Sequence, residues 1–264
     1  MMRILLTNDD GIYAPGLWAL YKELEKDYEL EVVAPDSEMS AVGRAITLSS
    51  PLRVQNAQKN GSFFGYAVKG TPADCVKIAV QELLSRPPDI ILSGINLGAN
   101  VGVNVLYSGT VSAATEGAFL GIKSAAISLD TRQDPDFRFA ARFSRELIEF
   151  MLKCGLRERT ALNVNIPALP ADAIAGVSIT RQGLARFRES FERRTDPRGG
   201  VYYWLSGEFP AEETSPDADG RALRERRISI TPISYDLSHE DEIERLRGCP
   251  PPQYRHMRSH DERA

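Results

Sequence analysis

Residues 5–16 read LLTNDDGIYAPG, and this stretch decides how the rest of the chain is interpreted. The apolar run 4–6 is typical of a buried strand, and it leads directly into a polar turn that contains Asp9 and Asp10. A helical pattern with Pro15 near its start follows. Two adjacent carboxylates at the end of an apolar strand repel each other and lose solvation. The stretch therefore predicts a strand-turn-helix unit in which a positive charge compensates the carboxylates of the turn.

Strand and helix patterns alternate outward from this unit through the first two thirds of the chain. Strands are predicted at 3–8, 29–35, 63–70, 89–96, 124–130 and 161–167, and helices at 15–26, 71–84, 110–121 and 135–155. Thr71 is a predicted N-cap, and Asp74 completes a capping-box pattern. This rhythm predicts an α/β fold, a Rossmann-like and mostly parallel sheet with helices on both faces, over residues 1–175.

The rhythm changes near residue 176. Strand patterns at 176–183, 186–194, 201–208 and 226–234 and a short helix at 239–248 predict a β-hairpin extension with a C-terminal helix over residues 176–248. The hairpins carry five aromatic residues, Phe187, Phe191, Tyr202, Tyr203 and Trp204. A ribbon with so much aromatic surface is marginal alone, so we expect a homo-oligomer, at least a dimer. The Pro-rich, charged tail 249–264 is predicted to be poorly ordered.

Composition narrows the class of protein. The chain has 264 residues, 42% of them hydrophobic, and a formal net charge of −4, which gives no basic footprint for a nucleic-acid polymer. No apolar stretch approaches the roughly 20 residues of a membrane span. The three cysteines Cys75, Cys154 and Cys249 form no CxxC pair, which favours a cytoplasmic protein. All three histidines lie near the C-terminus, which disfavours a mechanism based on histidine.

Polar residues follow the predicted strands at their carboxyl ends, where open α/β sheets bind ligands. After the first strand come Asn8, Asp9 and Asp10, and after the second come Ser40 and Arg44. Carboxylates, amides and hydroxyls without Cys or His suit a hard divalent cation such as Mg²⁺ or Mn²⁺, which would cancel the repulsion of the two carboxylates. The alternative is an Asp that caps the next helix or makes an Asx turn. Neither a GxGxxG fingerprint nor a Walker A motif occurs.

A second informative stretch is YSGTVSAATEGA, residues 107–118. Ser108, Gly109 and Thr110 stand at the start of a helix of small residues, where free backbone N–H groups and the helix dipole favour a phosphate. The alternative is a plain N-cap with close helix packing through small residues such as Gly117. The glycine- and asparagine-rich loop before this helix favours the phosphate interpretation, because such a loop is costly unless something binds it.

Taken together, these blocks resemble the SurE family of survival-protein nucleotidases. The matching segments, in family order, are ILLTNDDGIYAPG, VVAPDSEMSAVGRAITL, VKGTPADCV, PDIILSGINLGANVG, YSGTVSAATEGA and ISITPIS. The resemblance implies a metal-dependent phosphomonoesterase that hydrolyses nucleoside 5′- and 3′-monophosphates to nucleoside and phosphate. It also implies one divalent metal ion, Mg²⁺ or Mn²⁺, per subunit, held by Asp9, Asp10, Ser40 and Asn96.

The same resemblance extends to the remaining site residues. It places the phosphate at Ser108, Gly109 and Thr110 and puts Asn8 beside Asp9 and Asp10 in the catalytic group. Arg44, Asn100 and Tyr107 lie in the matching blocks and are expected to contact substrate. The family exchanges C-terminal segments between subunits, which implies a dimer or tetramer. This sequence departs from the pattern where Arg226 and Arg227 stand in place of the usual Gly-aromatic pair.

Other functions remain open at this point. One is a broader phosphatase that acts on polyphosphate or sugar phosphates, and another is a non-catalytic, metal-dependent nucleotide-binding protein. A nucleotide-sugar transferase also begins with a similar strand, but it needs a second Rossmann domain, for which this chain is short.

Overall fold

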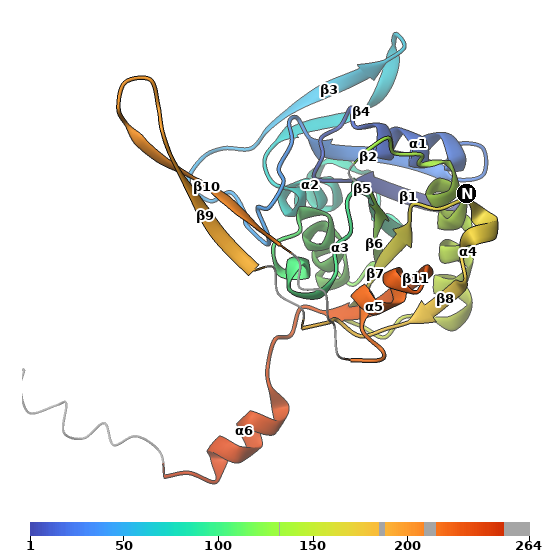
Figure 1. The fold of residues 1–264 in the computed structure, drawn as a ribbon. Coiled ribbons are helices and arrows are strands. Elements are labelled where there is room, and N and C mark those ends of the chain that lie inside the picture. Colours follow the sequence, from blue (N-terminus) through green and yellow to red (C-terminus); the bar gives the residue numbers. More distant parts are fainter. Residues whose placement is uncertain (132, 185–187, 209–214, 251–264) are drawn as a thin grey trace, which may run out of the picture. The chain divides into compact units, whose positions relative to one another are not determined.

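The computed structural model describes residues 1–131, 133–184, 188–208 and 215–250, and the chain divides into two units, Met1–Ser234 and Tyr235–Ala264. A sheet of nine strands, in the order β3-β4-β2-β1-β5-β6-β7-β11-β8, forms the centre of the first unit (Figure 1). Its strands are β1 (Arg3–Thr7), β2 (Glu29–Pro35), β3 (Arg53–Lys59), β4 (Ser62–Lys69), β5 (Ile90–Leu97), β6 (Lys123–Asp130), β7 (Thr160–Pro167), β8 (Gly176–Ile179) and β11 (Arg227–Ser234). All neighbouring pairs are parallel except β3–β4 and β11–β7. The predicted α/β class is confirmed.

Helices cover both faces of this sheet. The helices α1 (Pro15–Leu24) and α4 (Arg138–Cys154) bury residues such as Leu20 and Leu147 in one apolar cluster. The helices α2 (Pro72–Ile78) and α3 (Gly109–Phe119) bury Val76 and Ala113 in a second cluster with Leu5 of β1. All five residues of β1 are buried because both faces of the sheet are covered.

Local signals set the helix boundaries as the sequence predicted. Thr71 caps α2, with its hydroxyl accepting from Asp74 N at 3.2 Å and the Asp74 carboxylate accepting from Thr71 N at 2.9 Å. Pro15 occupies the start of α1, where its missing N–H costs nothing. Gly155 ends α4 with a φ of 66°, a conformation that favours glycine.

Three features of the first unit differ from the sequence-based prediction. The edge strand β3 escaped prediction because most of its side chains are polar and exposed. The predicted helix 71–84 is divided, with α2 followed by the π-helix η1 (Ala79–Leu83). Short 3-10 helices also occur at η2 (Gly102–Leu106) and η3 (Ala171–Ala173), and a short α-helix, α5 (Asp219–Arg224), precedes β11.

Only part of the expected β-hairpin extension forms a separate hairpin in the structure. The strands β9 (Arg188–Thr195) and β10 (Val201–Glu208) form a separate antiparallel hairpin, as predicted (Figure 1). The strands β8 and β11 instead join the central sheet, so that the sheet continues past residue 175. Because β11 pairs with β7 through six residues, its apolar positions are buried rather than displayed on a hairpin.

The hairpin β9–β10 exposes large apolar side chains. These are Phe191, Val201, Tyr202, Tyr203, Trp204 and Leu205, each at least 40% exposed. Phe187, which the sequence analysis included with them, lies outside the described residues. We call this hairpin, residues 188–208, the aromatic ribbon.

The second unit is described only as far as residue 250. It contains α6 (Glu240–Arg247), which His239 caps by accepting from Glu242 N at 3.2 Å, so the predicted short helix is present. The prediction for the tail lies mostly outside the described residues, because 251–264 are among those left out. Among the helices of the described part, none is long and apolar enough to cross a membrane.

Candidate metal and phosphate site

The two carboxylates of the opening stretch lie in a tight turn after β1. Asp9 is buried, with 4% of its surface exposed, whereas Asp10 is partly exposed. Asn8 Nδ2 donates to Gly11 O at 2.9 Å, and Gly11 takes a φ of 98°, which closes the turn. Ile12 N then donates to Pro35 O at 2.9 Å, which fixes the turn to the end of β2.

The loop after β2 lies against this turn. Met39 N donates to the backbone carbonyl of Asp9 at 2.7 Å. Ser40 Oγ donates to Glu38 Oε1 at 2.6 Å, and the charge of Glu38 acts on Asp10. The structure therefore brings the loop that carries Ser40 beside the paired carboxylates.

The carboxyl end of β5 lies on the other side of the turn. A hydrogen bond from Leu97 N–H reaches Asp10 and lowers the pKa of its carboxyl, against the larger effect of burial. Asn96 Nδ2 donates to Gly98 O at 2.7 Å, which leaves the side-chain oxygen of Asn96 as an acceptor. The carboxyl ends of β1 and β5 are adjacent in the sheet, as Thr7 pairs with Ser93.

The N-terminus of α3 contacts Asp9 directly. Thr110 Oγ1 donates to Asp9 Oδ1 at 2.6 Å inside the protein. A Cβ atom on Gly109 would lie 2.7 Å from Asp9 Cβ, so only glycine permits this approach. Ser108 caps the helix, accepting from Val111 N at 3.1 Å, as the alternative interpretation of this stretch expected. The predicted phosphate residues thus lie beside the predicted metal residues.

Electrostatics favour a cation at this turn. Burial raises the pKa of Asp9, and hydrogen bonds from Thr110 and Gly109 oppose that rise. Burial and the neighbouring charge of Asp9 raise the pKa of Asp10 to about 6. Each shift reports that the ionised carboxylates are unfavourable without compensation, which a bound divalent ion would supply.

The donor set fits a hard cation. Asn8 Oδ1 is buried and finds no hydrogen-bond partner among the described residues, so an acceptor oxygen faces the turn unsatisfied. In the same residues, no group of three or more His, Cys, Asp or Glu side chains could hold a metal. A site here would therefore rest on two carboxylates completed by neutral oxygens, which suits Mg²⁺ or Mn²⁺.

The three predicted substrate contacts have different surroundings. Tyr107 is 56% exposed, and its carbonyl accepts from Gly43 N at 2.9 Å, which joins the two loops. Arg44 is exposed on the loop after β2. Asn100 is buried and donates from Nδ2 to Ser128 Oγ at 2.9 Å, so its side chain holds the loop to the sheet.

One functional candidate escaped the sequence analysis. Asp219 has no exposed surface, and its carboxylate accepts from Gly102 N in the loop that leads to Ser108. In the sequence, Asp219 is one acidic residue of the turn-like stretch SPDADG, 215–220. Its burial depends on segments distant in sequence, those of Gly102 and Gly183, and was not predictable locally.

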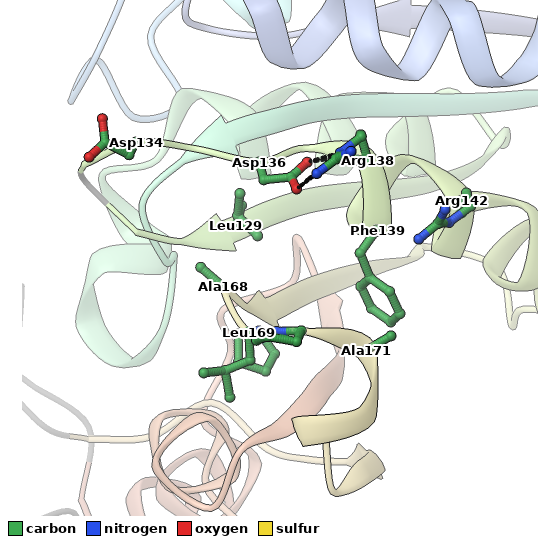
Figure 2. A pocket seen from close by; sticks show the side chains of 11 residues that line it. Leu129, Asp134, Asp136, Arg138, Phe139, Arg142, Ala168, Leu169 and Ala171 are labelled. Carbon is green, nitrogen blue, oxygen red and sulfur yellow. Dashed lines mark hydrogen bonds and ion pairs between the residues drawn. The ribbon is translucent and has the colours of Figure 1, made fainter.

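A surface pocket of about 520 Å³ lies at the carboxyl ends of β6 and β7 (Figure 2). Arg138 and Asp136 form an ion pair of 2.6 Å at its edge, and Phe139 and Leu169 contribute apolar surface. The lining includes none of the predicted metal or phosphate residues. Although pockets often mark active sites, the predicted metal ligands Asp9, Asp10 and Asn96 lie elsewhere, at the ends of β1 and β5.

The fold and the turn after β1 define a class: a Rossmann-like α/β protein with an acidic, oxygen-rich site at the carboxyl ends of its parallel strands. The family is more particular. The protein-family model described as "Survival protein SurE" matches residues 4–189 of the sequence, and the chain belongs to the SurE family. The family predicted from the sequence is confirmed.

Individual relatives agree along nearly the whole chain. A protein named 5′-nucleotidase SurE from Syntrophus aciditrophicus is 57% identical over 94% of this chain and 93% of its own length. One of the same name from Syntrophobacter fumaroxidans is 54% identical over 93% and 98%. A solved structure titled "Crystal Structure of Sure Protein from Aquifex aeolicus" has a TM-score of 0.81 at 37% identity and covers 93% of this chain and 98% of that one.

Proposed function

We propose that this chain is a metal-dependent 5′-nucleotidase, which hydrolyses nucleoside 5′-monophosphates, and 3′-monophosphates as well, to nucleoside and phosphate. The observation that carries the proposal is the contact between the N-terminus of α3 and Asp9, through Gly109 and Thr110. This contact places backbone donors suited to a phosphate beside carboxylates suited to a cation. The names of the relatives, 5′-nucleotidase SurE, support the same activity.

The site would hold one Mg²⁺ or Mn²⁺ ion per subunit, through Asp9, Asp10, Ser40 and Asn96. When bound, such an ion polarises a phosphoryl oxygen and lowers the pKa of water, which supplies a nucleophile near neutral pH. Asp9 and Asp10 provide the negative charge of the ligand set, because Ser40 and Asn96 are neutral.

The protein's own groups do the rest of the work. Asn8 Oδ1, a buried acceptor without a partner among the described residues, is suited to orient the attacking water. The amides at the start of α3, with Ser108, Gly109 and Thr110, stabilise charge on the transferred phosphoryl group. Burial raises the pKa of Asp10 to about 6 in the protein alone, and a bound cation would favour its ionised form. Tyr107 and Arg44 are exposed on adjoining loops and would contact the nucleoside.

A substrate panel tests the proposal. The purified chain is incubated with nucleoside 5′- and 3′-monophosphates, polyphosphate and sugar phosphates, each with Mg²⁺ or Mn²⁺, and released phosphate is measured. We expect the 5′-monophosphates to be the best substrates. Preference for polyphosphate or sugar phosphates would favour the broader phosphatase. Nucleotide binding without phosphate release under every metal would contradict the enzyme and favour a binding protein.

Two further parts of the proposal concern assembly and location. The aromatic ribbon exposes Tyr203, Trp204 and Leu205, and burying this surface between subunits would give a homo-oligomer. The three cysteines are free thiols, two of them exposed, which suits a reducing cytoplasm. Nucleoside monophosphates are then the small-molecule partner, with no role for a nucleic-acid polymer or a membrane.

A further inference from the structure

A buried carboxylate outside the proposed metal site holds three backbone segments together. Asp219 begins α5 and has no exposed surface. Its Oδ1 accepts from Gly183 N at 3.0 Å and from Gly220 N at 2.7 Å. Its Oδ2 accepts from Gly102 N at 3.0 Å, with Oδ1 at 3.2 Å from the same nitrogen. Hydrogen bonds to an ionised acceptor inside a protein are among the stronger ones.

Residues 98–108 connect β5 to α3, and we call them the phosphate loop. Gly102 begins the last turn of this loop. Gly102 opens the 3-10 helix η2, and its carbonyl accepts from Gln182 Nε2 at 2.9 Å. Both backbone groups of Gly102 are therefore held by side chains from the C-terminal third. Six residues later the loop ends at Ser108, the cap of α3.

The loop has a second, independent anchor in the sheet. Asn100 N donates to Asn165 Oδ1 at 2.7 Å, and Asn100 O accepts from Asn163 Nδ2 at 2.7 Å. This anchor fixes the first half of the phosphate loop to β7. The half that leads to Ser108 is held at Gly102 by Asp219 and Gln182, and further along the carbonyl of Tyr107 accepts from Gly43 N.

The same carboxylate lies at the base of the aromatic ribbon. Arg181 and Ala218 form a parallel bridge, with Arg181 N donating to Asp217 O and Asp219 N donating to Arg181 O, both at 2.9 Å. Gly183 precedes the aromatic ribbon in the chain and Asp219 follows it. Their hydrogen bond therefore joins the chain before the ribbon to the chain after it. The Asp219 carboxylate thus accepts hydrogen bonds both from Gly183, before the ribbon, and from Gly102 in the phosphate loop.

We propose that Asp219 is a positioning residue of the nucleotidase, which fixes Gly102 and thereby sets the phosphate loop for phosphate binding. The inference rests on the proposed function, because it takes Ser108 to Thr110 as the phosphate site. It predicts that loss of the Gly102 contact weakens phosphate binding while leaving the metal ligands in place.

The test is Asp219→Asn. An asparagine oxygen can replace Oδ1 and keep the bonds from Gly183 and Gly220, together with the longer one of 3.2 Å from Gly102 N. Its NH₂ group replaces the acceptor at 3.0 Å and faces Gly102 N–H, donor against donor, which weakens the hold on Gly102. The matched control is Asp217→Asn, two residues away, where the carboxylate is 55% exposed and pairs with Arg181 at 3.1 Å. The measurements are KM and kcat for AMP, the inhibition constant of inorganic phosphate, the metal activation constant and amide exchange of residues 98–108.

For Asp219→Asn we expect KM and the phosphate inhibition constant to rise by about tenfold, as for loss of a buried charged hydrogen bond. Amide exchange in the phosphate loop should accelerate, and the metal activation constant should stay within about twofold, as should every constant of Asp217→Asn. A lower melting temperature with unchanged KM and phosphate inhibition would overturn the inference, since it would mean a purely structural role.

Should Asp219→Asn fail to fold, Gln182→Ala decides, because it removes the other hold on Gly102 at a partly buried position. It should raise the same two constants by a smaller factor, and unchanged constants would overturn the inference. Failure of the proposed function is distinguishable. In that case the unmodified protein itself releases no phosphate from AMP or is not inhibited by phosphate, whatever exchange in the loop shows.

Discussion

The acidic turn after β1 buries a charged residue, whereas the aromatic ribbon exposes apolar residues. At the turn, Asp9 is a charged residue that is buried, and its neighbours are arranged around it. On the ribbon, Tyr203, Trp204 and Leu205 of β10 are exposed apolar residues, and among the described strands β10 pairs with β9 alone. Each is costly in the chain alone, the first through desolvation of charge and the second through exposed apolar area.

We expect the two regions to bind different partners. A small cation would relieve the turn without moving it, because the contacts around Asp9 and Asp10 already exist in the protein. The ribbon would need a large apolar surface, which a second copy of the chain can provide. Substitutions that change one region at a time separate these two requirements.

The largest effect is expected for Asp10→Asn. The metal loses half of its carboxylate charge, and the neutral Ser40 and Asn96 cannot replace it, so the rate of phosphate release should fall by about a hundredfold or more. Asparagine keeps the size and one acceptor oxygen, so the fold should survive, with the metal-free protein at least as stable as before. Phosphate release and melting temperature are measured on the same sample. Near-normal turnover at saturating metal would show that Asp10 is only a turn residue.

A smaller loss is expected for Thr110→Val, which removes the hydroxyl that donates to Asp9 Oδ1 at 2.6 Å. The buried carboxylate loses a partner, so kcat/KM for AMP should fall by about tenfold. The control is Thr115→Val in the same helix, where the hydroxyl donates to the carbonyls of Val111 and Ser112. Equal losses in both variants would mean that Thr110 acts only through the helix.

On the ribbon, Leu205→Asp should weaken self-association by about tenfold or more, because it places a charge within an apolar interface. Leu205 pairs with the apolar Phe191 across the ribbon, whereas Ser206 pairs with Ser190, so Ser206→Asp adds the same charge at a polar pair and is the matched control. Light scattering over a range of protein concentrations measures the effect. A monomer mass for the unmodified chain at micromolar concentration would refute the homo-oligomer.

The smallest effect concerns pH and the metal-free turn. The pKa of Asp10 is raised from 3.8 to about 6, so the folded protein binds more protons than the unfolded chain. This contribution to stability is fully present below about pH 4 and is lost as pH rises through about 6. For a partly exposed group, the free energy of unfolding falls by roughly 1–2 kcal/mol over this pH range, which lowers the melting temperature. Melting curves of chelated protein at pH 5 and pH 8 measure it, and Asp10→Asn should reduce the difference, with the raised pKa of Asp9 accounting for part of what is left.

The sequence predicted the acidic turn better than the ribbon end of the molecule, for a physical reason. The contacts of the turn come from segments whose strands are adjacent in a parallel sheet, so their loops had to converge at one edge. Ser108 caps α3 as the alternative interpretation of its stretch expected, whereas the contact of the Thr110 hydroxyl with Asp9 was not revealed by the motif.

Pairing over long distances was the part that local patterns could not give. Alternating polarity marked β8 and β11 as strands but did not say whether they join a hairpin or the central sheet. Their place depends on the exposed edge of β7, a property of the folded sheet. Asp219 was missed for the same reason, because it is buried only by segments distant in sequence.

One measurement tests the central claim, that the turn at Asp9 and Asp10 is a divalent-metal site that drives phosphate release. The purified chain is exhaustively chelated, its metal content is checked by elemental analysis, and phosphate release from AMP is followed before and after addition of Mg²⁺ or Mn²⁺. The account predicts no activity in the chelated protein and its return with the added ion. Full activity in protein confirmed free of metal would contradict it.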